Sequence, residues 1–240
     1  MPSHPITRLW PLPGSFAILL MLAAVPRAAG ATDIALTFGS LPSAQGWAYN
    51  TGGVAATEAL AWSVGGGVLA LNTMPYNVGL TGQGTSSFYS QSGVVNNFES
   101  IVIRMRARVL EWEGDGSSSV GGCLAFGFTQ GATLWAMGIT TSPSRIYNIN
   151  GVILSSAYDN TQFHDYRLEW TPPSSVRFYV DGTLISTNSV GFAQALNRIY
   201  FGDATGASNA HAEITQYEFL QGAATATPST SWGRLKSLYR

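Results

Sequence analysis

The sequence predicts an all-β protein built as a two-sheet antiparallel β-sandwich. Stretches with apolar residues at every second position recur along the chain, and 27 glycines supply turns between them. No long stretch has helical periodicity. The 240 residues are 45% hydrophobic and only 10% charged, so the chain can bury a large core, and its length suits one all-β domain.

Residues 1–31 have the pattern of a secretory signal peptide. Arg8 gives a weakly basic start, the run from Phe16 to Val25 is apolar, and Ala29-Gly30-Ala31 matches the small-x-small cleavage pattern. The alternative is a membrane anchor, but the run is too short to cross about 30 Å of hydrocarbon. We therefore expect cleavage after Ala31, a secreted protein that is extracellular or at the cell surface, and no transmembrane span in the mature chain.

The mature chain divides into three parts. Residues 32–221 carry the strand signals, and residues 222–231 are small and polar, which is typical of a flexible linker. Residues 232–240 place apolar side chains three to four positions apart among basic ones, as in a short amphipathic helix. This tail is expected to dock on a partner protein or an anionic surface; the alternative is an unstructured end without a role.

The clearest strand is predicted over 101–109. Its odd-numbered residues, from Ile101 to Val109, are apolar and are expected in the core. Arg104, Arg106 and Arg108 alternate with them and are expected on the opposite face.

A hairpin is predicted from 166–170 and 176–180. In the matching register Glu169 faces Arg177, so this carboxylate is expected to support the sheet. Asp181-Gly182 predicts a tight turn into the next strand. The buried residues expected from these strands are Ile101, Ile103, Met105, Leu168, Trp170, Phe178 and Val180. Further strands are expected at 34–38, 68–72, 123–129, 134–140, 145–149, 198–202 and 212–220.

Several segments resemble a known superfamily. Phe163–Pro172 followed by Val176–Gly182 is similar to a hairpin of concanavalin A-like jelly rolls, which family 16 glycoside hydrolases and laminin-G-like modules also carry. Phe38–Pro42 with Gly46-Trp47 resembles the start of such modules in bacterial secreted proteins, and Arg198–Asp203 resembles their last hairpin. The resemblance implies a concanavalin A-like jelly roll. It does not imply one function, because this fold carries lectins, hydrolases, lyases and adhesion modules.

The carboxylate motif of family 16 hydrolases, Glu-x-Asp-x-x-Glu or Glu-x-Asp-x-Glu, does not occur in the chain. Glu111 and Glu113 are the nearest candidates, since residues two apart share a strand face and retaining hydrolysis needs two carboxyls about 5–5.5 Å apart. The favoured interpretation is a solvated acidic end of a hairpin. The sequence therefore favours a protein that is not an enzyme.

Ligand-binding candidates are aromatic, polar and basic residues, and among the tryptophans Trp112 is the one expected to be exposed, because the alternation breaks into a loop there. Trp47, Trp62, Trp112 and Trp135 offer ring faces for sugar stacking, with core packing as the alternative for each. The segment from Asp203 to Asn209 offers polar groups. Arg104, Arg106 and Arg108 form a row that could contact an anionic polysaccharide, with a solvated outer face as the alternative.

Charge and composition exclude other classes. Removal of residues 1–31 takes away Arg8 and Arg27 and no acidic residue, which leaves 10 basic and 13 acidic residues and a net charge of −3. No basic excess indicates nucleic acid. No cofactor motif is found. A structural Ca²⁺ would suit the resemblance, but the scattered aspartates do not assign a site, and the metal remains unknown.

These patterns favour a secreted, non-catalytic module that binds glycan or another cell-surface polymer. Two alternatives stay open. One is a diverged secreted enzyme that cleaves polysaccharide, and the other is a structural or matrix protein. The missing carboxylate motif separates the first function from the enzyme, and an exposed aromatic platform would separate it from the matrix protein.

Overall fold

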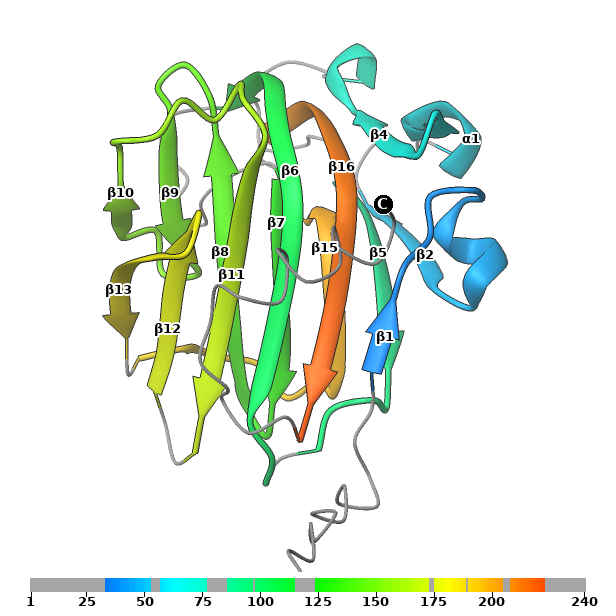
Figure 1. Ribbon diagram of the computed structural model, residues 1–240. Coiled ribbons are helices and arrows are strands. Elements are labelled where there is room, and N and C mark those ends of the chain that lie inside the picture. Colours follow the sequence, from blue (N-terminus) through cyan, green and yellow to red (C-terminus); the bar gives the residue numbers. More distant parts are fainter. Residues whose placement is uncertain are drawn as a thin grey trace, which may run out of the picture.

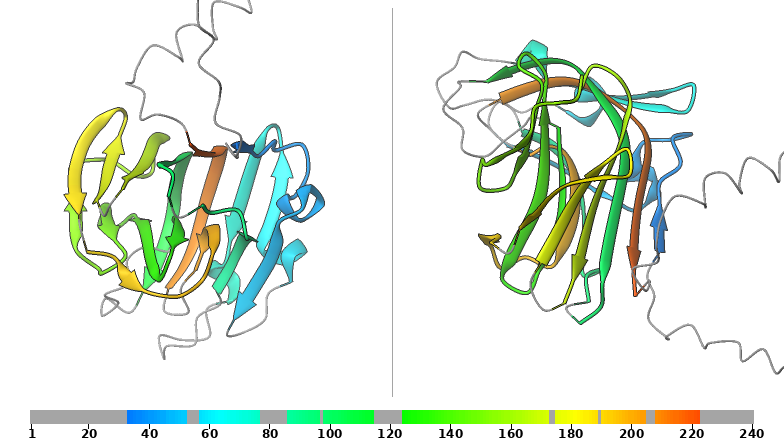
Figure 2. Two further views of the ribbon diagram at one scale, coloured as in Figure 1. Left: turned by 90° about the horizontal axis from the view of Figure 1, so that it is seen from below. Right: turned by 60° about the vertical axis from the view of Figure 1, so that its left-hand side comes forward.

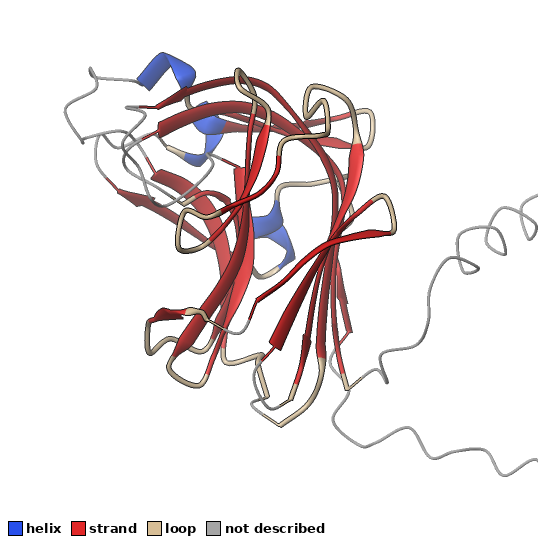
Figure 3. Cartoon of the chain, turned by 90° about the vertical axis from the view of Figure 1, so that its left-hand side faces the viewer, coloured by secondary structure: helices blue, strands red, loops and turns tan. Residues whose placement is uncertain are grey.

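The computed structural model describes residues 33–52, 57–76, 86–96, 98–114, 124–172, 175–188, 190–204 and 208–222. Within these ranges two antiparallel sheets of eight strands pack face to face (Figures 1 and 3). The predicted two-sheet antiparallel sandwich of jelly-roll type is confirmed. The predicted signal peptide 1–31, nearly all of the linker and the tail 232–240 lie outside the described residues.

Sheet A lies at the front of Figure 1 and contains the two longest strands, β6 and β16, side by side. Strand β1 pairs with β16 outside the main strand order. The order across the sheet is β13 (Thr183–Asn188), β12 (Ser175–Val180), β11 (His164–Thr171), β6 (Ile101–Gly114), β16 (Ser208–Gln221), β4 (Val68–Asn72) and β3 (Trp62–Gly65), with β1 at Asp33–Ala35.

Sheet B forms the second layer, behind sheet A in Figure 1. Strand β14 (Phe192–Ala193) pairs with the first residues of β8 outside the main order. The order across the sheet is β10 (Ile153–Ser155), β9 (Arg145–Asn148), β8 (Thr133–Thr140), β7 (Leu124–Gln130), β15 (Arg198–Asp203), β5 (Ser86–Ser92) and β2 (Ala48–Gly52).

Helical structure among the described residues is confined to short connections. These are the 3-10 turns η1 (Pro42–Gln45) and η2 (Met74–Tyr76) and the four-residue helix α1 (Glu58–Ala61). No helix in the described ranges has the length and apolarity that crossing a membrane requires.

The core lies between the two sheets and is built from side chains at alternate positions of the strands. The seven residues predicted to be buried are all at most 1% exposed, which confirms the alternation predicted for 101–109 and for the hairpin. In the core Trp47 packs edge to face against Phe201 and Tyr217, with ring centroids 5.1 and 5.3 Å apart, and the rings of Phe201 and Tyr217 are tilted with centroids 4.6 Å apart. Such pairs add about 0.5–1.5 kcal/mol each to the burial of the rings.

The predicted hairpin has the predicted register. Glu169 lies opposite Arg177, and its carboxylate lies 3.9 Å from the Nε of Arg177 and 3.2 Å from that of Arg167. Asp181 and Gly182 form the turn with φ angles of 49° and 80°, the left-handed region that a type I′ turn requires.

Several strands differ from the prediction. β1 ends at Ala35, earlier than the predicted 34–38, although Leu36 and Phe38 beyond it are buried in the core. Strands β2, β3 and β5 were not predicted. Their residues are polar, small or glycine at many positions, so the period-two signal in the sequence is weak.

Candidate ligand-binding hollow on sheet B

The outer face of sheet B is apolar at its centre. Ala125, Leu134, Ala136 and Tyr200 point away from the main core, and yet each is at most 8% exposed. Phe88 packs against them. An outer face of an antiparallel sheet usually carries polar residues, whereas here a small apolar cluster lies on it as a satellite of the core.

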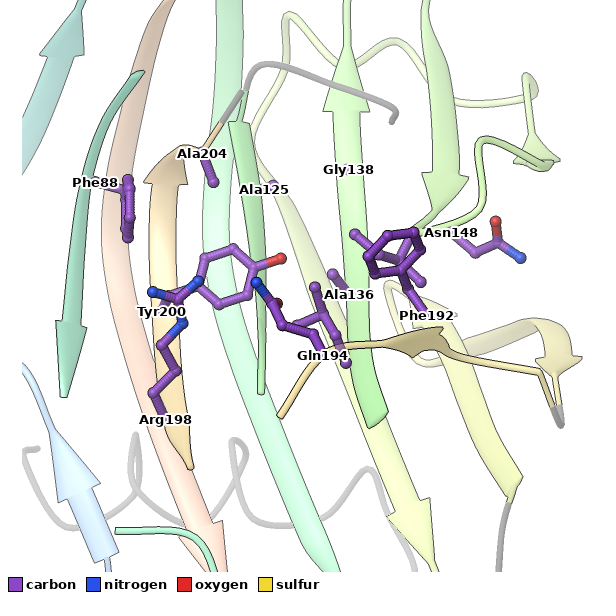
Figure 4. A pocket seen from close by; sticks show the side chains of 12 residues that line it. Phe88, Ala125, Ala136, Gly138, Asn148, Phe192, Gln194, Arg198, Tyr200 and Ala204 are labelled. Carbon is purple, nitrogen blue, oxygen red and sulfur yellow. The ribbon is translucent and has the colours of Figure 1, made fainter. Parts of the chain in front are cut away.

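A hollow of about 210 Å³ opens on this face (Figure 4). Its floor is made of small residues on the two central strands, namely Ala125 on β7 with Ala136 and Gly138 on β8. Gly127 on β7 lies opposite Ala136 in register, and a Cβ there would collide with the backbone carbonyl of Trp135 and lie 2.8 Å from the Cβ of Ala136. Small side chains therefore let β7 and β8 approach closely and leave the space above them open.

Aromatic rings form two walls of the hollow. Phe88 on β5 and Tyr200 on β15 lie on one side, with ring centroids 6.3 Å apart and planes tilted by 76°. Phe192 on β14 lies on the other side and is 50% exposed (Figure 4). Burial raises the pKa of the Tyr200 hydroxyl far above its usual value, so this group stays protonated over the physiological range.

The wall that carries Phe192 is held by the segment 190–197, which runs along the outside of sheet B in the left panel of Figure 2. The backbone N–H of Gln194 donates to the carbonyl of Ala132 at 2.9 Å. A Cβ at Gly191 would collide with Thr133 and lie 2.8 Å from the carbonyl oxygen of Leu134, so glycine permits the close approach.

Two polar side chains on the rim have buried atoms that lack partners. Nε of Arg198 and Oε1 of Gln194 are buried, and no described residue gives either a hydrogen bond. The Arg198 guanidinium lies 5.5 Å from the ring centre of Phe88 and 5.7 Å from that of Tyr200. The rings and these polar atoms together suit a small ring with an apolar face and hydrogen-bonding groups at its edge.

The predicted row of arginines lies elsewhere, on the outer face of sheet A. Each is paired with a carboxylate on a neighbouring strand. The pairs are Arg104 with Glu218 at 3.6 Å, Arg106 with Asp165 at 3.0 Å and Arg108 with Glu213 at 2.8 Å. The row is thus brought together as predicted, and its charges are neutralised within the sheet.

Glu111 and Glu113 are exposed near the end of β6, where Glu113 lies opposite Asn209 on β16. Trp112 between them is half-buried and packs against the core, with its indole N–H buried and unpartnered among the described residues. None of these four residues lines the hollow.

The remaining predicted ligand-binding residues are inside the sandwich. Three tryptophans lie in the core: Trp47 and Trp135 are each 4% exposed, and Trp62 is 2% exposed. Asp203 is fully buried and accepts a hydrogen bond of 2.9 Å from the hydroxyl of Thr73. That hydroxyl also accepts one from the backbone N–H of Ala210, so these groups tie sheet B to sheet A.

No group of three or more His, Cys, Asp or Glu side chains that could hold a metal ion occurs in the described part of the chain. Asp159 accepts hydrogen bonds from the hydroxyl and the backbone N–H of Thr161, which lower its pKa. Asp181 contacts His164 at 2.6 Å. Asp115 lies outside the described residues.

Sequence reasoning missed the residues of the hollow. Arg198 and Tyr200 alternate with the core residues Ile199 and Phe201. Their position on one shared face could therefore have been predicted from the strand at 198–202. The floor of the hollow could not be predicted. Ala125 and Ala136 lie in continuous apolar runs, where no alternation of polar and apolar residues tells which face of the strand is outward.

No protein-family model matches the chain, and the comparison with curated proteins finds no match. In structure the chain is similar to a glycosidic hydrolase, with a TM-score of 0.49 and 16% identity over 78% of this chain and 95% of that one. It is also similar to a Bacillus licheniformis beta-glucanase (TM-score 0.47, 15% identity, 78% and 97% covered) and to beta-agarase A from Zobellia galactanivorans (0.45, 13%, 82% and 97%). These likenesses concern the fold, and the site rests on the geometry of the chain itself.

Proposed function

We propose that this chain binds glycan, without cleaving it, in the hollow on the outer face of sheet B. The observation that carries the proposal is the pairing of aromatic walls with unpartnered polar atoms on one open face. Phe192 supplies an exposed ring and Phe88 a half-buried one beside the buried ring of Tyr200, and Arg198 and Gln194 supply a donor and an acceptor.

A sugar ring is the small molecule that suits this pairing best. One face of a pyranose is made of C–H groups and stacks on aromatic rings, while its edge carries hydroxyls that need planar polar partners. The volume of about 210 Å³ is below the ~300 Å³ at which pockets for drug-sized ligands begin. The hollow therefore suits one sugar unit of a longer chain, held weakly and reversibly.

The lack of turnover is supported by the residues that line the hollow. None of the described lining residues is acidic, whereas hydrolysis of a glycosidic bond uses a pair of carboxyls on either side of it. Glu111 and Glu113 lie on the other sheet. A polysaccharide-cleaving enzyme remains the alternative that activity assays address.

The proposal includes export to the cell surface or the medium, which rests on the sequence pattern of residues 1–31. Mass spectrometry of the protein recovered from a secreting host tests this part. The expected N-terminus is Thr32, and a cytoplasmic product that keeps residues 1–31 would contradict it.

The test of binding is titration calorimetry of the full chain against a panel of neutral and acidic oligosaccharides. Phe192→Ala is expected to weaken binding about three- to tenfold, because it removes a ring from the wall. Phe98→Ala is the matched control, since Phe98 is 88% exposed and does not line the hollow. It is expected to leave binding unchanged.

Two results would contradict the proposal. The first is no binding to any sugar of the panel, which favours the structural or matrix alternative. The second is release of reducing ends from a polysaccharide, abolished by Glu111→Gln or Glu113→Gln, which would make the chain an enzyme.

A further inference from the structure

The described arginines fall into two groups: those on sheet A form ion pairs, whereas Arg145 and Arg198 on sheet B form none with a described residue. Arg145 donates to the hydroxyl of Tyr147 at 3.4 Å and does not line the hollow. On sheet A, five arginines each have a carboxylate oxygen 2.8–3.9 Å from a guanidinium nitrogen. They are Arg104, Arg106, Arg108, Arg167 and Arg177. Arg198 on sheet B has no ion pair with any described residue, although it begins β15 with a neighbouring strand on each side, β7 and β5. Its charge is therefore not neutralised by the part of the chain that is described.

The surroundings of Arg198 orient its charge without cancelling it. Thr129 on β7 and Ser92 on β5 lie opposite it in register, and neither is acidic. The rings of Phe88 and Tyr200 lie 5.5 and 5.7 Å from the guanidinium carbon. Cation–π contacts of this kind hold a guanidinium in place but leave its N–H groups free to donate.

The hydrogen-bonding needs of the rim are complementary to an acidic sugar. Nε–H of Arg198 is a buried donor without an acceptor, and Oε1 of Gln194 is a buried acceptor without a donor. Both side chains are partly exposed and line the hollow, so a charged oxygen group on the ligand would pair with the guanidinium of Arg198 and a ligand hydroxyl with the amide of Gln194. Water could serve either side chain, but only an anion also offsets the positive charge.

We infer that the hollow selects sugar units that carry a charged oxygen group, carboxylate or sulfate, with Arg198 as the residue that determines this preference. The inference rests on the proposed glycan binding in the same hollow and names the class of ligand. A carboxylate or sulfate oxygen would accept from the Arg198 guanidinium while the sugar ring lies between Tyr200 and Phe192.

The experiment compares three probes by calorimetry on the full chain. They are tri-galacturonate, its carboxyl-reduced neutral counterpart, and a sulfated galactose trisaccharide. At least one acidic probe is expected to bind tenfold or more tightly than the neutral one. Arg198→Gln is expected to weaken acidic binding about ten- to a hundredfold, the range for a charge-assisted hydrogen bond, and to change neutral binding less than about threefold.

Arg177→Gln is the matched control, because it removes a charge from sheet A at a residue that does not line the hollow. It is expected to leave all three affinities unchanged. The acidic probe whose binding is weakened by Arg198→Gln identifies the recognised group as carboxylate or sulfate. Higher salt should weaken the binding of the acidic probes and leave the binding of the neutral probe unchanged.

The outcomes separate this inference from the proposed function. If the neutral probe binds as tightly as both acidic ones, or Arg198→Gln weakens all of them equally, the chain binds glycan but Arg198 does not select charge. If no probe binds, both the inference and the proposed function fail.

Discussion

The outer faces of the two sheets differ in how their charged side chains are paired. The face of sheet A carries cations and carboxylates on adjacent strands, and they pair with one another, as Arg108 does with Glu213 at 2.8 Å. The face of sheet B carries small and aromatic residues around a hollow, with Arg198 outside any ion pair of the described residues. One face thus pairs its charges within the sheet, and the other keeps a charged group that a ligand can pair with.

This difference shows that a row of charged side chains along one face of a strand is weak evidence for a binding surface. Arg104, Arg106 and Arg108 share a face, as the sequence predicts, but acidic residues of β16 and β11 meet each of them. Because surface ion pairs contribute only about 0–1 kcal/mol each, they mainly remove the charge that an anionic ligand would need. Unsatisfied polarity is the better indicator of a site.

The largest expected effect is on a tyrosine of sheet B. Tyr200→Ala should lower the free energy of unfolding by about 3–5 kcal/mol, the range for removing a buried aromatic ring. Tyr200 is 3% exposed although it faces outward. Urea denaturation measures the change.

Tyr179→Ala is the matched control for this substitution. Tyr179 lies on the outer face of sheet A, is half-buried and has the Arg167 guanidinium 4.0 Å from its ring centre. It is expected to cost about 1 kcal/mol, since one cation–π contact and partial burial are lost. Equal costs at the two positions would show that the two outer faces do not differ in packing.

A smaller effect is expected at Gly127 on β7, beside the floor of the hollow. Gly127→Ala should destabilise the protein by about 1–3 kcal/mol, because the added methyl group meets the backbone of β8, which cannot rotate away. Gly39→Ala is the control, since a Cβ there has no atom within 4 Å, and it should change stability by less than about 1 kcal/mol. A neutral Gly127→Ala in thermal unfolding would mean that β7 and β8 are less closely packed than described.

The smallest effect concerns the ion pairs of sheet A. A double-mutant cycle with Arg108→Gln and Glu213→Gln should give a coupling energy of about 0.2–1 kcal/mol, because both side chains are partly exposed. Their exposed fractions are 32% and 22%. The coupling should shrink in 1 M salt, and a coupling that is large or insensitive to salt would show that this face contributes more to stability than proposed.

The sequence predicted the parts of the fold in which polar and apolar residues alternate. β6, β11 and β12 were placed correctly because arginines and glutamates mark one face of each strand, and the register of Glu169 against Arg177 followed from the short loop. β7 and β8 were placed within a residue or two, but their outer face could not be identified. Ala125 and Ala136 are as apolar as the core residues beside them.

The binding site was less predictable because its parts come from distant segments. Phe88, Phe192 and Tyr200 belong to three strands. Only the pairing of β5 with β15, and of β14 with β8 in the same sheet, brings them together. Trp135 was a reasonable candidate by residue type, yet its parity on β8 directs the ring into the core. Residue type alone does not decide exposure; the strand register does.

The central claim is that ligand binds on the outer face of sheet B. The most direct measurement is a crystal structure of the full chain with the tightest-binding oligosaccharide of the panel. We predict sugar density against Phe88, Tyr200 and Phe192, with hydrogen bonds to Arg198 and Gln194. Sugar density on the arginine row of sheet A instead, with the hollow free of it, would contradict the account.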